Sequence, residues 1–214
     1  MAYWQKDFYA PASGAWHDIL TATADCKLSF CQLINISPTD SCRAIIAIGA
    51  TDDVAILAPT GLACAQTGAV GTASYEYVVT AVKADGRETE PSAAVEINAV
   101  GADALSADNY HTLSWSAVTN AAKYRVYCRM GGADSAVIKV AEVTALTYAN
   151  KGAMSAAEKW PWVNMTAVKS MLAWADLPPG TGLEPISRPV PFASGAKVRL
   201  FTTGQVSLYA SGEV

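Results

Sequence analysis

The feature that most constrains the fold is a series of short segments in which the character of the side chains alternates every second residue. Residues 75–82 read Tyr-Glu-Tyr-Val-Val-Thr-Ala-Val, so two tyrosines, a valine and an alanine fall on one face. A period of two with β-branched and aromatic residues is typical of a β-strand. The same alternation recurs in residues 112–118, 123–129 and 136–143. The middle of the chain is therefore predicted to be all-β.

Turn signals separate these segments. Asp85-Gly86 follows the first of them, and Pro91 then ends ladder pairing, so a hairpin is expected to return through residues 93–100. In the next strand Leu113 and Trp115 share a side, which makes Trp115 a predicted core anchor.

The charge content of the chain is low. Charged residues make up 16% of the 214 residues, against the roughly 25% that is usual for globular domains. A protein surface with so few charges is usually in contact with other protein subunits. The formal net charge is -4, so the chain lacks the basic field that counterion release on nucleic acid requires. We expect no direct binding of DNA or RNA.

No targeting or membrane segment stands out. The sequence starts MAYWQKDFYAPASGAWHDIL, without a charged region followed by an apolar one, and no apolar run approaches the ~18 residues of a membrane span. We therefore expect synthesis and folding in a cytoplasm. The odd number of cysteines fits neither CxxC pairs nor zinc spacing and favours buried free thiols. A disulfide between two of Cys26, Cys31 and Cys42 remains an alternative only if the protein later meets an oxidising medium.

Three segments carry a resemblance to a known family. SYEYVVTAVKADGRETEPS, TLSWSAVTNAAKYRVYCR and TYANKG resemble parts of a fibronectin type III domain. That family has a Leu-x-Trp strand with the core tryptophan, a facing Tyr-x-Val-Tyr strand, and a Tyr-x-Val-x-Ala strand that runs into a glycine turn. Trp115, Tyr124, Tyr77 and Gly86 match these positions, and Val126 lies on the face of Tyr124.

The order of the matching strands departs from the family. The Tyr-x-Val-x-Ala strand precedes the Leu-x-Trp strand here, whereas it follows in a standard domain. The resemblance therefore implies a permuted fibronectin type III-like, or Ig-like, β-sandwich. The reversed order is similar to modules in phage tail and fibre proteins.

The two flanks contribute further strand patterns. Residues 27–35 and 42–48 are joined by a turn-like Ser-Pro-Thr-Asp-Ser, while 197–201 and 205–210 read as a hairpin. An isolated hairpin is only marginally stable in water. We therefore predict one discontinuous, jelly-roll-like β-sandwich from residues 1–58 plus 153–214, with residues 59–152 inserted through a loop. Two independent tails remain the alternative.

No catalytic, cofactor or metal constellation is found, so we expect a non-enzymatic protein. His17 and His111 lie outside any His-x-x-x-His or Cys/His pattern, and phosphate loops and nucleophile elbows are absent. The pair Asp52-Asp53 suggests a solvated domain junction more than a calcium site. Asn35-Ile-Ser and Asn164-Met-Thr fit the glycosylation pattern, which has no meaning without secretion.

Aromatic residues form two groups outside the predicted core. Trp160-Pro161-Trp162, with Trp174 downstream, fits core packing, a subunit interface or stacking on sugar rings. The N-terminal group suggests an apolar arm that lies on a neighbouring subunit. The candidate interface or glycan contacts are Tyr3, Trp4, Phe8, Trp160 and Trp162.

The resemblance implies a function in a virus particle. It implies a decoration, neck, tail-tip or fibre-base protein of a bacteriophage virion that attaches through the flanking sandwich and displays the inserted module. Its expected partners are other virion proteins and further copies of itself, as a homo-oligomer such as a trimer or hexamer. The alternative is a carbohydrate-binding or adhesin module that recognises a cell-surface glycan. A domain cut from an extracellular enzyme is a third, weaker reading.

Overall fold

The chain folds entirely into β-structure. The computed structural model describes residues 3–10, 16–22, 25–49, 54–101, 103–131, 135–152, 157–166, 168, 170–186, 190–192 and 196–213. Within these ranges every regular element is a β-strand and no helix occurs, which confirms the predicted all-β class. The described residues therefore contain no helix that could cross a membrane.

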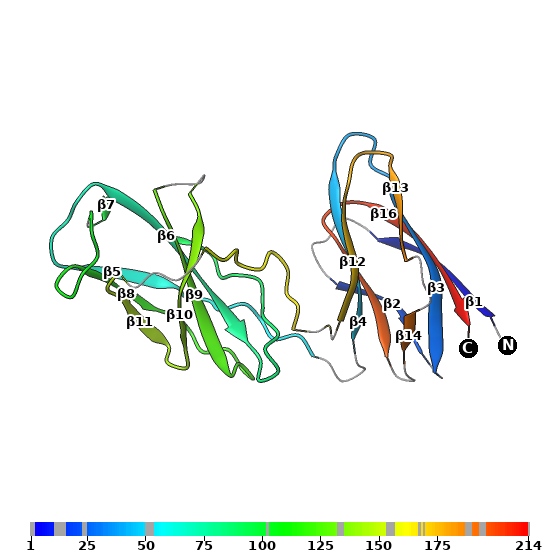
Figure 1. Cartoon of the computed structure of the whole chain (residues 1–214), viewed down its shortest axis with the longest axis horizontal. Helices are drawn as coiled ribbons and strands as arrows, with labels where there is room; N and C mark the ends of the chain where they lie inside the picture. The colour runs from blue at the N-terminus through cyan, green and yellow to red at the C-terminus, as the bar shows by residue number, and fades with distance from the viewer. Residues whose placement is uncertain are drawn as a thin grey trace. The chain divides into compact units, whose positions relative to one another are not determined.

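Two compact units divide the chain. The flanking unit comprises Met1–Asp53 and Ala167–Val214, and the inserted unit comprises Val54–Thr166. Figure 1 shows both, with the blue and red ends of the chain together in the flanking unit.

The flanking unit is built from two antiparallel sheets. One has the order β1-β16-β3-β13, and β14 also pairs with β3; the other has the order β12-β4-β15-β2. Leu33 and Leu208 from the first sheet share a buried cluster with Ile46 and Leu200 from the second, so the sheets pack face to face. The strands of this unit are β1 (Tyr3–Ala10), β2 (Trp16–Thr21), β3 (Cys26–Asn35), β4 (Cys42–Gly49), β12 (Ser170–Leu177), β13 (Gly182–Ile186), β14 (Val190–Phe192), β15 (Lys197–Thr202) and β16 (Val206–Glu213).

Both sheets of the flanking unit mix strands from the two ends of the chain. Cys31 of β3 lies opposite Ala210 of β16, and Ile46 of β4 lies opposite Leu200 of β15. The inward side chains at these positions are at most 2% exposed. The two ends of the chain are therefore parts of one body and not independent tails.

The inserted unit occupies the connection between two neighbouring strands. β4 ends at Gly49 and β12 begins at Ser170, and Ser170 lies opposite Ile48 in the antiparallel ladder. In an uninterrupted sheet a short hairpin loop would join such strands. The insertion therefore takes the place of a hairpin loop. The ladder between β4 and β12 stays paired up to the point where the insertion begins.

The inserted unit is a second pair of antiparallel sheets. Its four-stranded sheet has the order β10-β9-β6-β7 and its three-stranded sheet the order β11-β8-β5. One buried cluster joins residues of both sheets. The strands are β5 (Ala63–Thr67), β6 (Ala73–Val82), β7 (Val95–Gly101), β8 (Tyr110–Ser114), β9 (Lys123–Met130), β10 (Val137–Val143) and β11 (Thr147–Asn150).

The residues expected in the core of the inserted unit lie there. Trp115 and Tyr124 are each 5% exposed, and their ring centroids are 5.6 Å apart. Tyr77 and Val126 are fully buried in the same cluster. The Tyr124 hydroxyl accepts a hydrogen bond from the Val118 amide at 2.9 Å, which ties the turn before β9 to the core.

The Asp-Gly turn forms where the sequence places it. Gly86 has a φ of 88°, a conformation that costs little only for glycine, and its amide donates to the Lys83 carbonyl oxygen at 2.9 Å. β7 then begins at Val95, after Pro91.

The inserted unit extends beyond the predicted limits of 59 and 152. Ile56 is 5% exposed and belongs to its core cluster, and its backbone is hydrogen-bonded to the side chains of Asn164 and Thr166. On the other side Ala157 forms a β-bridge with Ile138. Residues 54–58 and 157–166 therefore belong to the inserted unit, and the predicted boundaries are corrected accordingly.

Candidate functional site

An aromatic strap crosses the outer face of the four-stranded sheet of the inserted unit. We give this name to residues 157–166, which run alongside β9 and β10 in Figure 1. The Glu158 amide donates to the Val137 carbonyl oxygen at 3.0 Å, and the Met165 amide donates to the Glu88 carbonyl oxygen at 2.9 Å. The side chains of Val78 and Tyr127, which point away from the core cluster on the outer face of this sheet, are 2% and 1% exposed. The sheet is thus buried on both faces at these positions.

The two tryptophans of the strap have different environments. The guanidinium carbon of Arg129 lies 4.8 Å from the centroid of the Trp160 ring, within cation–π range. Arg129 also forms an ion pair with Glu76 at 2.8 Å. Trp162, by contrast, is 40% exposed. Trp160 is therefore held on the sheet, whereas Trp162 presents part of its surface to solvent.

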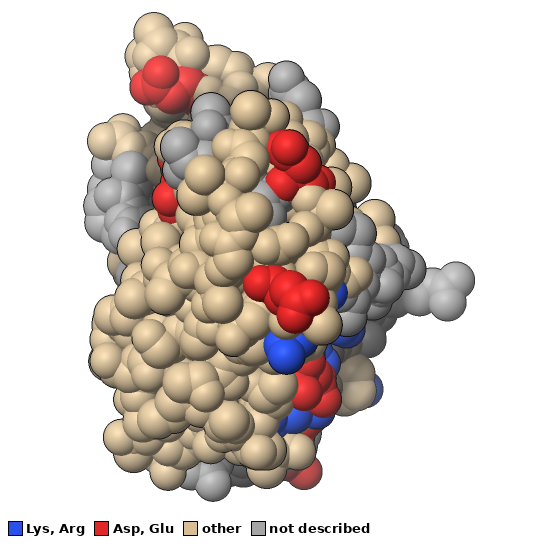
Figure 2. All heavy atoms as spheres, turned by 90° about the vertical axis from the view of Figure 1, so that its left-hand side faces the viewer, with Lys and Arg blue, Asp and Glu red and all other residues tan. Residues whose placement is uncertain are grey.

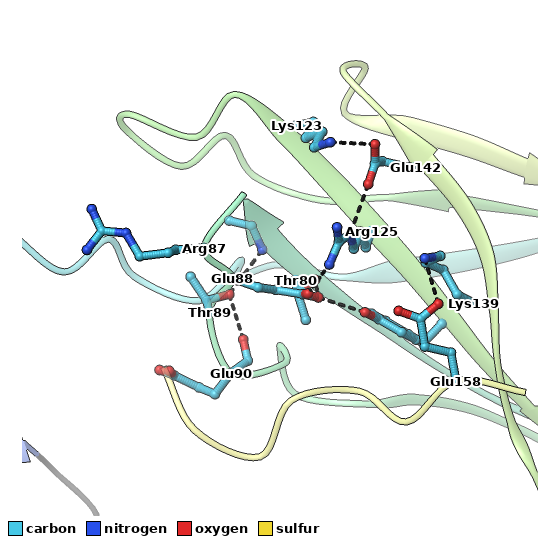
Figure 3. Close-up of polar contacts among 12 residues, drawn as sticks. Thr80, Arg87, Glu88, Thr89, Glu90, Lys123, Arg125, Lys139, Glu142 and Glu158 are labelled. Atoms are coloured by element: carbon cyan, nitrogen blue, oxygen red, sulfur yellow. Dashed lines mark hydrogen bonds and ion pairs between the residues drawn. The ribbon is translucent and has the colours of Figure 1, made fainter. Parts of the chain in front are cut away.

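The Glu88 carboxylate lies at the centre of a cluster of polar side chains on the same outer face of the sheet, as Figure 3 shows. Its carboxylate accepts hydrogen bonds from the hydroxyls of Thr80 and Tyr127 and from the guanidinium of Arg125. Arg125 reaches on to Glu142 at 2.9 Å. Burial, and then the hydrogen bond and charge of Glu88, raise the pKa of the Tyr127 hydroxyl.

The charges of this cluster are mutually compensated. Burial alone would lower the pKa of Arg125, but Glu142 and Glu88 together raise it, so the guanidinium stays charged. The hydrogen bonds of Lys123 and Arg125 lower the pKa of Glu142. The cluster thereby joins the strands β6, β9 and β10 to the loop that carries Glu88. The arrangement fixes the loop on the sheet, where the strap binds the Glu88 backbone.

Replacing the Glu88 carboxylate should loosen both the loop and the strap. We expect Glu88→Gln to lower the free energy of unfolding of the inserted unit by about 1–2 kcal/mol, because a hydrogen bond to a charged group is replaced by a neutral one. Denaturant unfolding of the variant measures the loss. Glu96→Gln on β7, whose side chain is exposed, is the matched control and should change stability by less than about 0.5 kcal/mol. Equal effects in the two variants contradict this role of Glu88.

A polar chain crosses the core of the inserted unit. Asn150 Nδ2 donates to the Tyr77 hydroxyl oxygen at 3.1 Å, and that hydroxyl lies 2.8 Å from Nδ1 of His111. A hydroxyl oxygen can accept two hydrogen bonds and donate one, so Tyr77 either donates to Nδ1 of His111 or accepts from it, according to the imidazole tautomer. His111 is fully buried, and burial lowers its pKa. The rings of Tyr75 and His111 pack edge-to-face, and their centroids are 4.7 Å apart.

The two glycosylation-like motifs have structural roles. In each of them the asparagine Oδ1 accepts the backbone amide two residues on, at 3.0 Å for both Ser37 and Thr166. The Nδ2 group then donates to a distant segment: Asn35 to the Leu177 carbonyl oxygen at 2.9 Å, and Asn164 to that of Ile56 at 2.7 Å. Each motif therefore fixes a turn to a segment far away in sequence, a role that sequence analysis missed.

Asn35 offers a direct test of such a pin. Its Nδ2 group also donates to the Asp40 and Pro178 carbonyl oxygens, and the residue is fully buried. We expect Asn35→Asp to destabilise the flanking unit by at least about 2 kcal/mol, because a carboxylate oxygen would face carbonyl oxygens. Thermal unfolding measures this loss. Asn120→Asp, at an exposed position of the turn before β9, is the control and should be close to neutral; if the two variants match, the pin has no such role.

The N-terminal aromatic group is not a free arm. Tyr3–Ala10 forms β1, which pairs along its whole length with β16. β1 is thus the edge strand of this sheet. Phe8 packs against the core of the flanking unit and lies 6.0 Å from the His17 ring. The side chains of Tyr3, Trp4 and Trp174 lie outside the described residues.

The remaining candidate residues are the cysteines and the acidic pair Asp52-Asp53. No three His, Cys, Asp or Glu side chains of the described part of the chain lie together as metal ligands, and Asp52-Asp53 falls outside that part. Cys31, Cys42, Cys64 and Cys128 are free thiols, and burial raises the pKa of Cys31 to about 12. The side chain of Cys26 is outside the described residues.

The chain was compared with known proteins at three levels. Protein-family models, curated sequences and solved structures all give no match.

Proposed function

We propose that the chain is a structural component of a bacteriophage particle that attaches by its flanking unit and displays the inserted unit. The observation that carries this proposal is the position of the insertion. A complete sandwich replaces the loop between β4 and β12, and the sheet of the flanking unit stays paired up to that point. A loop tip is where a scaffold can carry an additional module at little cost to its own fold.

We propose further that the inserted unit is a permuted fibronectin type III-like sandwich. Support comes from its sheets of four and three strands, the number found in constant-type immunoglobulin sandwiches. The pair β6–β7 precedes β8 and β9 in the chain but lies beside β9 in the sheet. Trp115 and Tyr124 pack in the core, as their positions in the resemblance imply.

The surface of the inserted unit suits contacts with neighbouring proteins. β5, β8 and β11 contain no Asp, Glu, Lys or Arg, and two of them are the edges of their sheet. Soluble monomers usually protect sheet edges with charges. Figure 2 shows large uncharged areas on the side it presents, with the Lys and Arg side chains gathered along one margin. This fits assembly into a homo-oligomer or into a particle.

Two measurements test the proposal. Antibodies raised against the purified chain should label intact phage particles in electron micrographs, and native mass spectrometry should give a multiple of the chain mass. Absence of label on every particle fraction, together with a strictly monomeric mass, overturns it.

A second candidate rests on Trp162. Its ring is partly exposed on a strap that the sheet holds in place, which is an arrangement suited to stacking on a sugar. A glycan array distinguishes the two functions, because an adhesin would bind a defined class of sugars and Trp162→Ala would abolish the signal.

A further inference from the structure

The chain enters and leaves the inserted unit through two segments that are hydrogen-bonded to each other. The Ile56 amide donates to Thr166 Oγ1 at 2.9 Å, and Asn164 Nδ2 donates to the Ile56 carbonyl oxygen at 2.7 Å. Thr166 Oγ1 in turn donates to Asn164 Oδ1 at 2.6 Å. These three residues form a closed ring of hydrogen bonds, which together with Lys83 we call the stem clamp.

Lys83 links the two segments a second time. Its ammonium lies 3.4 Å from the Val54 carbonyl oxygen and 3.3 Å from the Thr166 carbonyl oxygen. The Lys83 backbone is itself fixed, because its amide donates to the Arg87 carbonyl oxygen at 2.9 Å. One cation thus bridges a carbonyl of the incoming segment and a carbonyl of the outgoing one, at the end of β6.

The stem clamp is continuous with the core of the inserted unit. Ile56 is 5% exposed and belongs to the core cluster, and Thr166 is fully buried. Met165, between the two clamp residues of the outgoing segment, binds the Glu88 carbonyl oxygen. The clamp therefore cannot open without disturbing buried groups.

We propose that the stem clamp is a mechanical latch. The incoming and outgoing segments meet at one end of the inserted unit, so tension that arrives through the β4–β12 connection acts on the clamp before it acts on any core strand. The latch keeps the inserted unit folded while the chain before and after it is pulled. This inference does not depend on what the protein attaches to.

Optical-tweezers extension of the whole chain, held at its two termini, tests the latch. The flanking unit carries both termini and should open first. A second, separate step should then release roughly 110 residues at up to ~3.6 Å each, on the order of 400 Å. We expect Lys83→Met to make this second step about fivefold faster at a given force, which corresponds to one net hydrogen bond.

Two further variants complete the test. Thr166→Val, which keeps the side-chain shape but removes the hydroxyl, should accelerate the second step at least as much as Lys83→Met and leave the first step unchanged. Asn98→Leu, at an exposed site, is the control and should change neither step. Unaltered second-step kinetics in Lys83→Met overturn the latch, as does an inserted unit that opens before the flanking unit.

Discussion

Trp115→Ala should lower the free energy of unfolding of the inserted unit by about 3–5 kcal/mol, the usual cost of removing a buried aromatic side chain. Trp115 is 5% exposed and packs on Tyr124, which in turn holds the Val118 turn, so several core contacts are lost together. Because the flanking unit has its own core, its stability should stay within about 0.5 kcal/mol of the wild-type value. Denaturant unfolding followed by hydrogen-exchange mass spectrometry reports on each unit separately.

The matched control is the same substitution on the strap. Trp162 is 40% exposed, so Trp162→Ala should cost less than about 1 kcal/mol. Comparable losses in the two variants, or a loss shared equally by both units, contradict the assignment of Trp115 to a separate core.

The stability of the inserted unit should fall in mild acid because of His111. Burial lowers the pKa of this imidazole in the folded state, whereas an unfolded histidine titrates near 6.5. The unfolded chain therefore binds more protons below about pH 6.5, and stability drops by up to about 1.4 kcal/mol per pH unit until the folded pKa is reached.

The neighbours of His111 do not titrate in this range. Burial raises the pKa of Tyr75 and Tyr77, and raises that of Cys64 to about 11 and that of Cys128 to about 12. A protonated imidazole would carry hydrogen on both ring nitrogens, and its buried Nε2 has no hydrogen-bond partner among the described residues.

Variants of the two histidines isolate this effect. His111→Gln should flatten the pH dependence of the inserted unit just below pH 6.5, whereas His17→Gln, in the flanking unit, should leave it as in the wild type. Unfolding curves recorded across this range measure both. A wild-type inserted unit whose stability is independent of pH there excludes the proposed role of His111.

The sequence was most informative where strands alternate strongly. The segment 75–82 and the segment 123–129 each lie within a strand of the structure, because aromatic and β-branched residues on one face fill the core. Where small residues replace large ones the signal fades. β5 reads Ala-Cys-Ala-Gln-Thr and was not predicted, although it pairs with β8 throughout.

Long-range hydrogen bonds account for most of what sequence analysis missed. The strap has no period, and its membership of the inserted unit depends on partners such as Val137 and Glu88. Glu88 lies in a predicted turn, and its guanidinium partner Arg125 is 37 residues away. β8 likewise ends at Ser114 and not at residue 118, and the amides of Trp115 and Ser116 beyond it donate to the carbonyl oxygens of Leu146 and Thr60, which lie outside the strands. Such pairings cannot be deduced from local pattern.

The central claim is that the chain folds as two separately cooperative sandwiches, with the strap belonging to the inserted one. Hydrogen-exchange mass spectrometry of wild type and Trp115→Ala tests it most directly. We predict that peptides from 54–152 and from 157–166 lose protection together in the variant, while peptides from 25–49 and 196–213 exchange as before. Strap peptides that keep the protection of the flanking unit, or a uniform loss along the whole chain, would contradict it.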